Sequence, residues 1–115
     1  MKVKRDGFGI PIIESDDLEE LFFLFGYAQG EDHLLPMLLN FREARGRLSE
    51  VIGEEGLERD LRSRAYAMDK VAEKDLRLTS DEERKILQAF VKGINGFISE
   101  KEKSLPEWAR EKVEE

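Results

Sequence analysis

Residues 26–53, GYAQGEDHLLPMLLNFREARGRLSEVIG, hold the features that decide the fold. Most of them continue a helical pattern that runs to about Arg45. Pro36 removes one backbone hydrogen bond from that helix, so a kink or break is predicted near residues 32–35. At 100° per residue the apolar side chains fall on two sides, which predicts a helix buried between two layers. One side holds Leu18, Leu21, Phe22, Phe25, Ala28, Leu35 and Leu39, and the other holds Phe23, Tyr27, Leu34, Leu38 and Phe41.

The residues before this helix predict a β-hairpin over residues 1–14. Asp6-Gly7-Phe8-Gly9 supplies the turn between two short apolar runs. Pro11 cannot donate a hydrogen bond to a neighbouring strand, so its strand is expected at an edge. Because an isolated hairpin is marginally stable, it is expected to contribute to a larger sheet. The helix should then begin with Asp16 as its N-cap. The Glu19 side chain is expected to reach back to the N-cap backbone, which completes a capping box.

The residues after Arg45 predict further helix. A short piece from Arg47 to Ile52 is expected to end at Gly53 as its C-cap. A second helix is expected from about Glu55 to Leu76, and a third begins at Ser80, with Glu83 completing a capping box. The prediction is a mainly α chain with an N-terminal β-hairpin. Its single segment, 1–115, divides into the hairpin (1–14), three helices (15–100) and a charged tail or short helix (101–115).

Glycine marks one face of the third helix. Its apolar stripe runs from Ile86 to Ile98, and Gly93 and Gly96 lie within or beside it. Glycine has no side chain to keep a neighbour away, so a partner element is expected to approach closely there.

Two residues inside the first helix are candidates for chemistry. His33 is the only histidine, so a metal site built on a histidine pair is excluded, and a half-exposed structural role is favoured. Asp32 falls inside the first apolar side, where a carboxylate needs a cation or several donors. Arg42, Arg45 and Arg47 are the candidate cations. A structural anchor is favoured over a catalytic acid or metal ligand, because no second carboxylate shares that face at helical spacing.

The remaining candidates favour structural roles as well. Ser49 lacks the Gly-x-Ser-x-Gly turn of an esterase nucleophile and has no base nearby, which favours a loop or capping role. The charged runs at 54–64 and 100–103 are typical of solvated helix faces. Aromatic residues at helical spacing could line an acyl pocket, but core packing is the default. These aromatics are Phe22, Phe23, Phe25, Tyr27 and Phe41.

Composition excludes several classes of protein. The net charge is −7, and each Lys or Arg cluster is interleaved with Glu or Asp, which argues against nucleic-acid binding. No stretch approaches the ~20 apolar residues of a membrane span. Met1 to Arg5 shows no charged-then-apolar leader, so a cytoplasmic protein is expected, or an extracytoplasmic one whose leader was removed. The absence of cysteine excludes disulfides and thiolate nucleophiles.

The same residues resemble the N-terminal segment of the penicillin acylase family. RDGFGIPII at 5–13 resembles the family's opening RDxxGxPHI, with Ile12 where the family usually has His. A second family pattern, GY…AQDRL.QM…R..A.GRLAE..G, is similar to Gly26-Tyr27, Asp32-His33-Leu34, Met37, Arg42, Ala44 to Glu50 and Gly53. FVKGINGFI at 90–98 is similar to the family's YaxGvNayi, and Leu105-Pro106-Glu107 matches its LPxEF position. The departures, His33, Gly30-Glu31 and Pro36, suggest a divergent subfamily.

The resemblance implies a fragment of a four-layer αββα fold, that of the N-terminal-nucleophile hydrolases. In that family the precursor cleaves itself, and a Ser or related residue at the new β-subunit N-terminus attacks an amide with its own amine as base. The implied substrates are N-acyl compounds such as β-lactams with acyl side chains and acyl-homoserine lactones. The nucleophile lies downstream of this segment, so no catalytic, cofactor-binding or metal residue is assigned here.

The resemblance also implies partners. The expected partner is the catalytic β-segment, with an N-acyl substrate in the full enzyme and no nucleic acid or membrane. No cofactor is expected in this chain, although some members carry a calcium ligand in the full enzyme. The alternative function is a stand-alone helical protein-binding module without catalytic activity.

Overall fold

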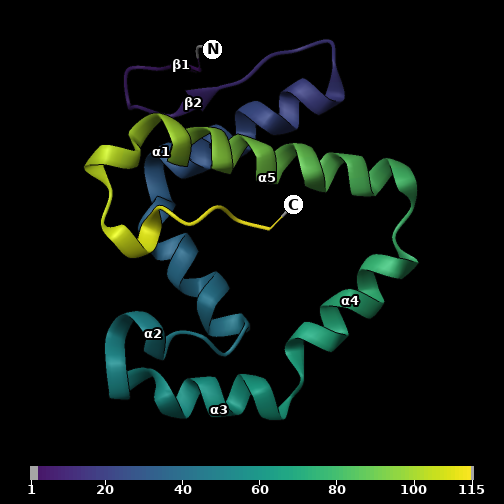
Figure 1. The fold of residues 1–115 in the computed structure, drawn as a ribbon. Coiled ribbons are helices and arrows are strands. Elements are labelled where there is room, and N and C mark those ends of the chain that lie inside the picture. The colour runs from purple at the N-terminus through teal and green to yellow at the C-terminus, as the bar shows by residue number, and fades with distance from the viewer. Residues whose placement is uncertain (1–2, 115) are drawn as a thin grey trace. The chain divides into compact units, whose positions relative to one another are not determined.

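The structure, a computed structural model, describes residues 3–114 (Figure 1). It divides into two compact units. The first unit contains the residues up to Leu34 and those from Asp81 onward, and the second contains Leu35–Ser80. The helices are α1 (Leu18–Ala44), α2 (Ser49–Ile52), α3 (Leu57–Ala65), α4 (Met68–Leu78) and α5 (Asp81–Lys101), with 3₁₀ turns η1 (Gly53–Gly56), η2 (Glu102–Ser104) and η3 (Glu107–Ala109). The predicted class, mainly α with an N-terminal hairpin, is confirmed.

The first unit begins with the predicted hairpin. Strands β1 (Lys4–Arg5) and β2 (Pro11–Ile12) pair antiparallel, with Lys4 opposite Ile12 and Arg5 opposite Pro11. The described residues form a sheet of these two strands alone, so Pro11 does lie on an edge strand. The first two residues of the predicted range, Met1 and Lys2, lie outside the described part of the chain.

Helix α1 begins one residue later than the sequence predicted. Its side-chain cap is Asp17, whose Oδ1 accepts from the Glu19 N–H at 3.1 Å. Ser15 Oγ in turn accepts from the Asp17 N–H at 3.1 Å. The predicted cap, Asp16, was therefore wrong by one position, since the adjacent aspartates carry the same capping chemistry and sequence alone does not separate them.

The predicted kink in α1 is confirmed, and it falls at His33, whose φ of −138° and ψ of 23° are not helical. Pro36 explains this position. Its nitrogen has no hydrogen for the carbonyl of residue 32, and its ring crowds that same carbonyl, so the strain is released at the next residue. The first unit's share of α1 ends at Leu34, the residue after His33.

The core of the first unit forms where α1 meets α5. The predicted close approach at Gly93 is confirmed, because a Cβ there would lie 2.0 Å from the Phe23 carbonyl oxygen. Gly26 is the reciprocal position on α1, where an added Cβ would lie 2.0 Å from the Phe90 carbonyl oxygen. Backbone therefore touches backbone at this crossing, and no side chain fits between the helices. The buried apolar residues around it are Leu24, Ala28, Leu34, Ala89, Ile94, Phe97, Ile98 and Ala109.

The charged C-terminal residues are ordered rather than a simple tail. After η2 and η3 the chain returns to α5, where the Asn95 side chain donates to the Val113 carbonyl at 2.9 Å and accepts from the Val113 N–H at 2.7 Å. Ala109 is fully buried. The prediction left open a charged tail or a short helix, and the structure has two short 3₁₀ turns followed by a segment without regular secondary structure.

In the second unit, α1 ends at a glycine C-cap. Gly46 has a φ of +70° and its N–H donates to the Glu43 carbonyl, while the Arg47 N–H donates to the Arg42 carbonyl at 2.8 Å. These two bonds form a Schellman motif. The predicted cap at Gly53 is also confirmed, because that residue has a φ of +78° and its N–H donates to the Ser49 carbonyl.

The second helix predicted from Glu55 to Leu76 was wrong as one continuous element. The structure has η1, α3 and α4 in this region, and the break between the two helices falls at Ala67, whose φ is +52° (Figure 1). The predicted three helices are therefore five. No Gly or Pro marks this break in the sequence, since residues 65–67 are Ala-Tyr-Ala.

Replacing Ala67 by glycine is expected to stabilise the second unit by about 0.5–1 kcal/mol, because a left-handed conformation strains any residue with a Cβ. The gain is reduced by the greater freedom of glycine in the unfolded chain. Ala72→Gly, in the middle of α4, is the matched control and should destabilise by up to about 1 kcal/mol. Urea denaturation measures both, and destabilisation by Ala67→Gly would contradict the left-handed break.

Candidate functional site

The hairpin loop is held by a dense set of hydrogen bonds. Asp6 Oδ1 accepts from the N–H groups of Phe8 at 2.8 Å and Ile10 at 2.9 Å, and Arg5 Nη1 donates to the Gly9 carbonyl at 2.8 Å. Gly9 has a φ of +80°, a conformation that glycine adopts without strain. The loop is therefore rigid, although the Phe8 side chain at its tip is exposed.

Arg5 also joins the hairpin to the kinked part of α1. Its guanidinium pairs with the carboxylates of Glu31 and Asp32, the latter at 3.0 Å. The hydrogen bond with Asp32, followed by that with Glu31, raises the pKa of Arg5. All three side chains keep part of their surface in water, so this cluster contributes to positioning more than to stability.

Asp32 does not lie where the sequence predicted. Its side chain is 32% exposed and pairs with Arg5, instead of being buried beside Arg42, Arg45 or Arg47. The prediction assumed a continuous helical wheel and a covered face, but the helix is interrupted at His33 and Asp32 is an exposed residue. The preference for a structural anchor over a catalytic acid fits this ion pair. His33 itself is exposed.

The aromatic residues of α1 mainly pack against α5. The Phe25 ring lies 5.3 Å from that of Phe90, and the Tyr27 ring lies 5.6 Å from that of Phe97, edge to face. The Tyr27 hydroxyl donates to Glu100 Oε2 at 2.5 Å, and this bond, with desolvation and the charge of Glu100, raises the pKa of Tyr27 to about 12. A phenol held in its protonated form is a poor general base, so Tyr27 serves the helix packing.

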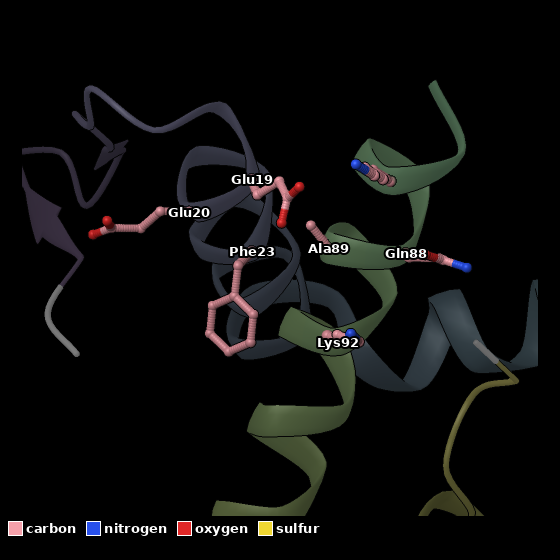
Figure 2. A pocket seen from close by; sticks show the side chains of 7 residues that line it. Glu19, Glu20, Phe23, Gln88, Ala89 and Lys92 are labelled. Atoms are coloured by element: carbon pink, nitrogen blue, oxygen red, sulfur yellow. The ribbon is translucent and has the colours of Figure 1, made fainter. Parts of the chain in front are cut away.

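A shallow groove of about 360 Å³ lies between α1 and α5 (Figure 2). Glu19, Glu20 and Phe23 line it from α1, and Lys85, Gln88, Ala89 and Lys92 line it from α5. Glu20 and Gln88 point away from one another in Figure 2, so the polar groups do not converge on one point. The lining includes no hydroxyl, imidazole or thiol, and therefore no nucleophile for amide hydrolysis.

The second unit contains a buried carboxylate that sequence reasoning missed. Asp60 is 3% exposed and accepts three hydrogen bonds, from the Leu48 N–H at 2.7 Å, the Ser49 N–H at 2.8 Å and the Ser49 hydroxyl at 2.5 Å. Burial alone would raise the pKa of Asp60, but these bonds and the charge of Arg64 outweigh it and hold that pKa below its ordinary value. The solvated-face prediction for residues 54–64 was wrong at this position.

Asp60 gives the GRLSE sequence at residues 46–50 a structural role. It caps the first N–H groups of α2, and Arg64 Nε donates to the Gly46 carbonyl at 2.9 Å beside it. Arg47 Nε pairs with Glu50 at 2.6 Å, which lowers the pKa of Glu50. The capping or loop role predicted for Ser49 is confirmed, since its hydroxyl donates to Asp60 at the start of α2.

Residues 3–114, the part of the chain that the structure describes, contain neither a metal-binding cluster nor a membrane-spanning helix. No group of three or more His, Cys, Asp or Glu side chains in that range could hold a metal ion. Within the same range, no helix has the length and apolar character needed to cross a membrane.

Comparisons with known proteins point to one family. A family model described as penicillin amidase matches residues 1–114. The penicillin acylase 2 proenzyme of Pseudomonas sp. (strain SE83) is 34% identical over 99 residues, which are 86% of this chain and 13% of that protein. An acyl-homoserine lactone acylase, QuiP of Pseudomonas fluorescens (strain Pf-5), is 28% identical over 106 residues, covering 92% of this chain and 13% of that protein.

A solved structure shares the fold. The thermostable penicillin G acylase from Alcaligenes faecalis matches with a TM-score of 0.80 at 24% identity, over 93% of this chain and 58% of that chain. The chain thus spans about one eighth of the length of the curated relatives, but more than half of the solved acylase chain.

Proposed function

Because the chain belongs to the penicillin amidase family, we propose that it is the N-terminal, non-nucleophile segment of an amidohydrolase that cleaves linear amide bonds in N-acyl compounds. The observation that carries this proposal is the family match over residues 1–114, in a chain that spans about one eighth of its acylase relatives. The relatives are named for penicillins and acyl-homoserine lactones, and both names imply an acyl group on an amide nitrogen.

The hydroxyl groups of the described residues support a non-nucleophile role. Five of the seven described serine and threonine hydroxyls bond to backbone or to charged side chains. Ser15 accepts from the Asp17 N–H, Ser49 donates to Asp60, Thr79 donates to the Asp75 carbonyl, Ser99 accepts from Lys112, and Ser104 donates to the Lys101 carbonyl. A serine or threonine nucleophile needs an adjacent base such as an imidazole or an amine, and among these hydroxyl contacts only that of Ser99 is to an amine, the ammonium group of Lys112. These contacts are those of caps and packing.

The proposed partner is the catalytic segment that carries the N-terminal nucleophile. The coverage figures support a division into two chains, since the same region is 13% of a proenzyme but 58% of a chain in a solved acylase. In this scheme the partner supplies the nucleophile and its amine, and the present chain supplies scaffold. The hairpin, a two-stranded sheet with free edges and an exposed Phe8, is suited to extend a sheet of the partner.

The isolated chain is expected to show no amidase activity. The test is to incubate the purified chain with a chromogenic phenylacetyl amide and with an acyl-homoserine lactone, and then to repeat both assays after co-expression with any acylase-like coding sequence found beside its own. Activity is expected only in the co-expressed complex. Hydrolysis by the chain alone would contradict the proposal. A chain that is folded but does not bind the co-expressed segment would favour the stand-alone binding module.

A further inference from the structure

The Asn95-Gly96 pair in α5 has a chemical reactivity that the fold conceals. The side-chain amide of an asparagine can react with the backbone nitrogen of the next residue, and a glycine in that position has no side chain to hinder the reaction. The chain contains two asparagines, and the other one, Asn40, is followed by the bulky Phe41. Asn95 is therefore the asparagine more prone to this modification.

The reaction is a deamidation that consumes one water molecule. The Gly96 nitrogen loses its proton and bonds to Asn95 Cγ, while the side-chain nitrogen gains a proton and leaves as ammonia. The product is a five-membered succinimide ring. Water then opens the ring at either of its two carbonyl groups, which leaves aspartate or isoaspartate in place of asparagine.

The folded first unit engages both reacting groups. Gly96 lies inside α5, so its N–H takes part in the hydrogen bonds of the helix. Asn95 is 6% exposed, and its side-chain amide donates to the Val113 carbonyl at 2.9 Å and accepts from the Val113 N–H at 2.7 Å. Neither group is available for the reaction while α5 is helical and the C-terminal segment lies against it.

The helical turn around Asn95 depends on its packing. Gly93 and Gly96 lie on either side of Asn95, and glycine is a poor helix former. The contacts that hold the turn are the close approach of Gly93 to the α1 backbone and the C-terminal segment, where Lys112 also donates to Ser99. Loss of these contacts would free the Gly96 nitrogen and the Asn95 amide together.

We propose that Asn95 is a deamidation site that the folded chain protects and that opening of the first unit exposes. The modification works in one direction. Aspartate can still accept from the Val113 N–H, but it cannot donate to the Val113 carbonyl, and it places a charge at a nearly buried position. Each opening thus converts some molecules into a form whose C-terminal segment binds α5 less well. This chemistry is independent of the proposed function.

Peptide mapping by mass spectrometry measures the reaction in the 115-residue chain, incubated in mildly alkaline buffer with and without urea. Without urea, Asn95 should gain the mass of deamidation at least about tenfold more slowly than in urea, because the reaction proceeds from the open state. In urea, Asn40 should react about tenfold more slowly than Asn95, because Phe41 hinders the attack. Equal rates with and without urea, or equal rates for the two asparagines in urea, would overturn the proposal.

Two alanine substitutions separate opening from chemistry. Gly93→Ala disrupts the crossing with α1, so it should speed the reaction about tenfold or more without urea and leave the rate in urea unchanged. A Gly93→Ala chain that fails to fold should react at the urea rate. A Cβ at Gly96 meets only the Phe23 ring, at 3.3 Å, so the fold tolerates Gly96→Ala. Its methyl group should nevertheless slow the reaction about tenfold under both conditions. An unchanged rate in either variant without urea would contradict the proposal.

Asn95→Asp reproduces one product and tests its consequence. The Val113 amide should exchange with solvent at least about threefold faster in this variant than in wild type, because the C-terminal segment has lost one of its bonds to α5. Gln88→Glu makes the same change of amide to carboxylate at an exposed position of α5, and should leave that exchange within about twofold of wild type. Equal exchange in the two variants would show that the modification does not impair docking, contrary to the proposal.

Discussion

Gly93→Ala is expected to lower the free energy of unfolding of the first unit by about 3 kcal/mol or more. The new methyl group would lie 2.0 Å from the Phe23 carbonyl oxygen and 2.7 Å from the Tyr27 nitrogen. Both are backbone atoms, so no side-chain rotation can relieve the overlap and the two helices must separate. Urea denaturation followed by the fluorescence of Trp108, which belongs to the first unit, measures the loss.

The same helix provides the control. A Cβ at Gly96 would meet only the end of the Phe23 ring, at 3.3 Å, and that ring can move by a few tenths of an ångström. Alanine is also favoured over glycine in a helix by about 1 kcal/mol, so Gly96→Ala should be nearly neutral or slightly stabilising. Gly26→Ala should resemble Gly93→Ala, because its methyl group would lie 2.0 Å from the Phe90 carbonyl oxygen. Equal stabilities for all three variants would refute the close crossing.

The features that the sequence predicted correctly depend on local chemistry. Pro36 disturbs the helical turn that precedes it, and Gly53 adopts a positive φ without strain. Residues 6–9 carry turn-forming side chains, and the Gly9 N–H donates to the Asp6 carbonyl. Gly93 was identified as a point of close approach by its place in an apolar stripe. Its partner on α1, Gly26, could not be identified, because a pairing between helices depends on distances in the fold rather than along the chain.

The features that sequence missed depend on contacts between distant residues. Asp32 was assigned to arginines close in sequence, but it pairs with Arg5, 27 residues away. Ala67 breaks the predicted second helix without a Gly or Pro, so no local signal marks it. Asp60 looked like one charge among many in a solvated run, and only its contact with residues 48 and 49 shows its role. The absence of catalytic residues from this segment stays a prediction, tested by the activity assay.

Asp60→Asn is expected to destabilise the second unit strongly, with its thermal midpoint lowered by roughly 5–10 °C. Asparagine is nearly the same size as aspartate, but its NH₂ group donates hydrogen bonds where the carboxylate oxygen accepts them. That NH₂ group would face at least one of the three N–H and O–H groups that now donate to Asp60. A buried N–H without an acceptor is costly. Hydrogen exchange reports this directly, since the amides of Leu48 and Ser49 should exchange at least about tenfold faster. Asp75→Asn, on exposed α4, is the control and should shift the midpoint by no more than about 2 °C.

The effect of Asp60→Asn should also depend on pH, because the folded structure holds the pKa of Asp60 below its ordinary value of 3.8. A carboxylate with a lowered native pKa contributes stability that is fully present above its unfolded pKa and is lost as the pH falls through the native one. The difference in stability between wild type and Asp60→Asn should therefore be constant from about pH 7 to about 5 and shrink below about pH 4. Thermal unfolding of both proteins between about pH 7 and about pH 2 measures it. A difference that stays constant to the acid end of that range would mean that the ionised form of Asp60 is not what holds Leu48 and Ser49 at the start of α2.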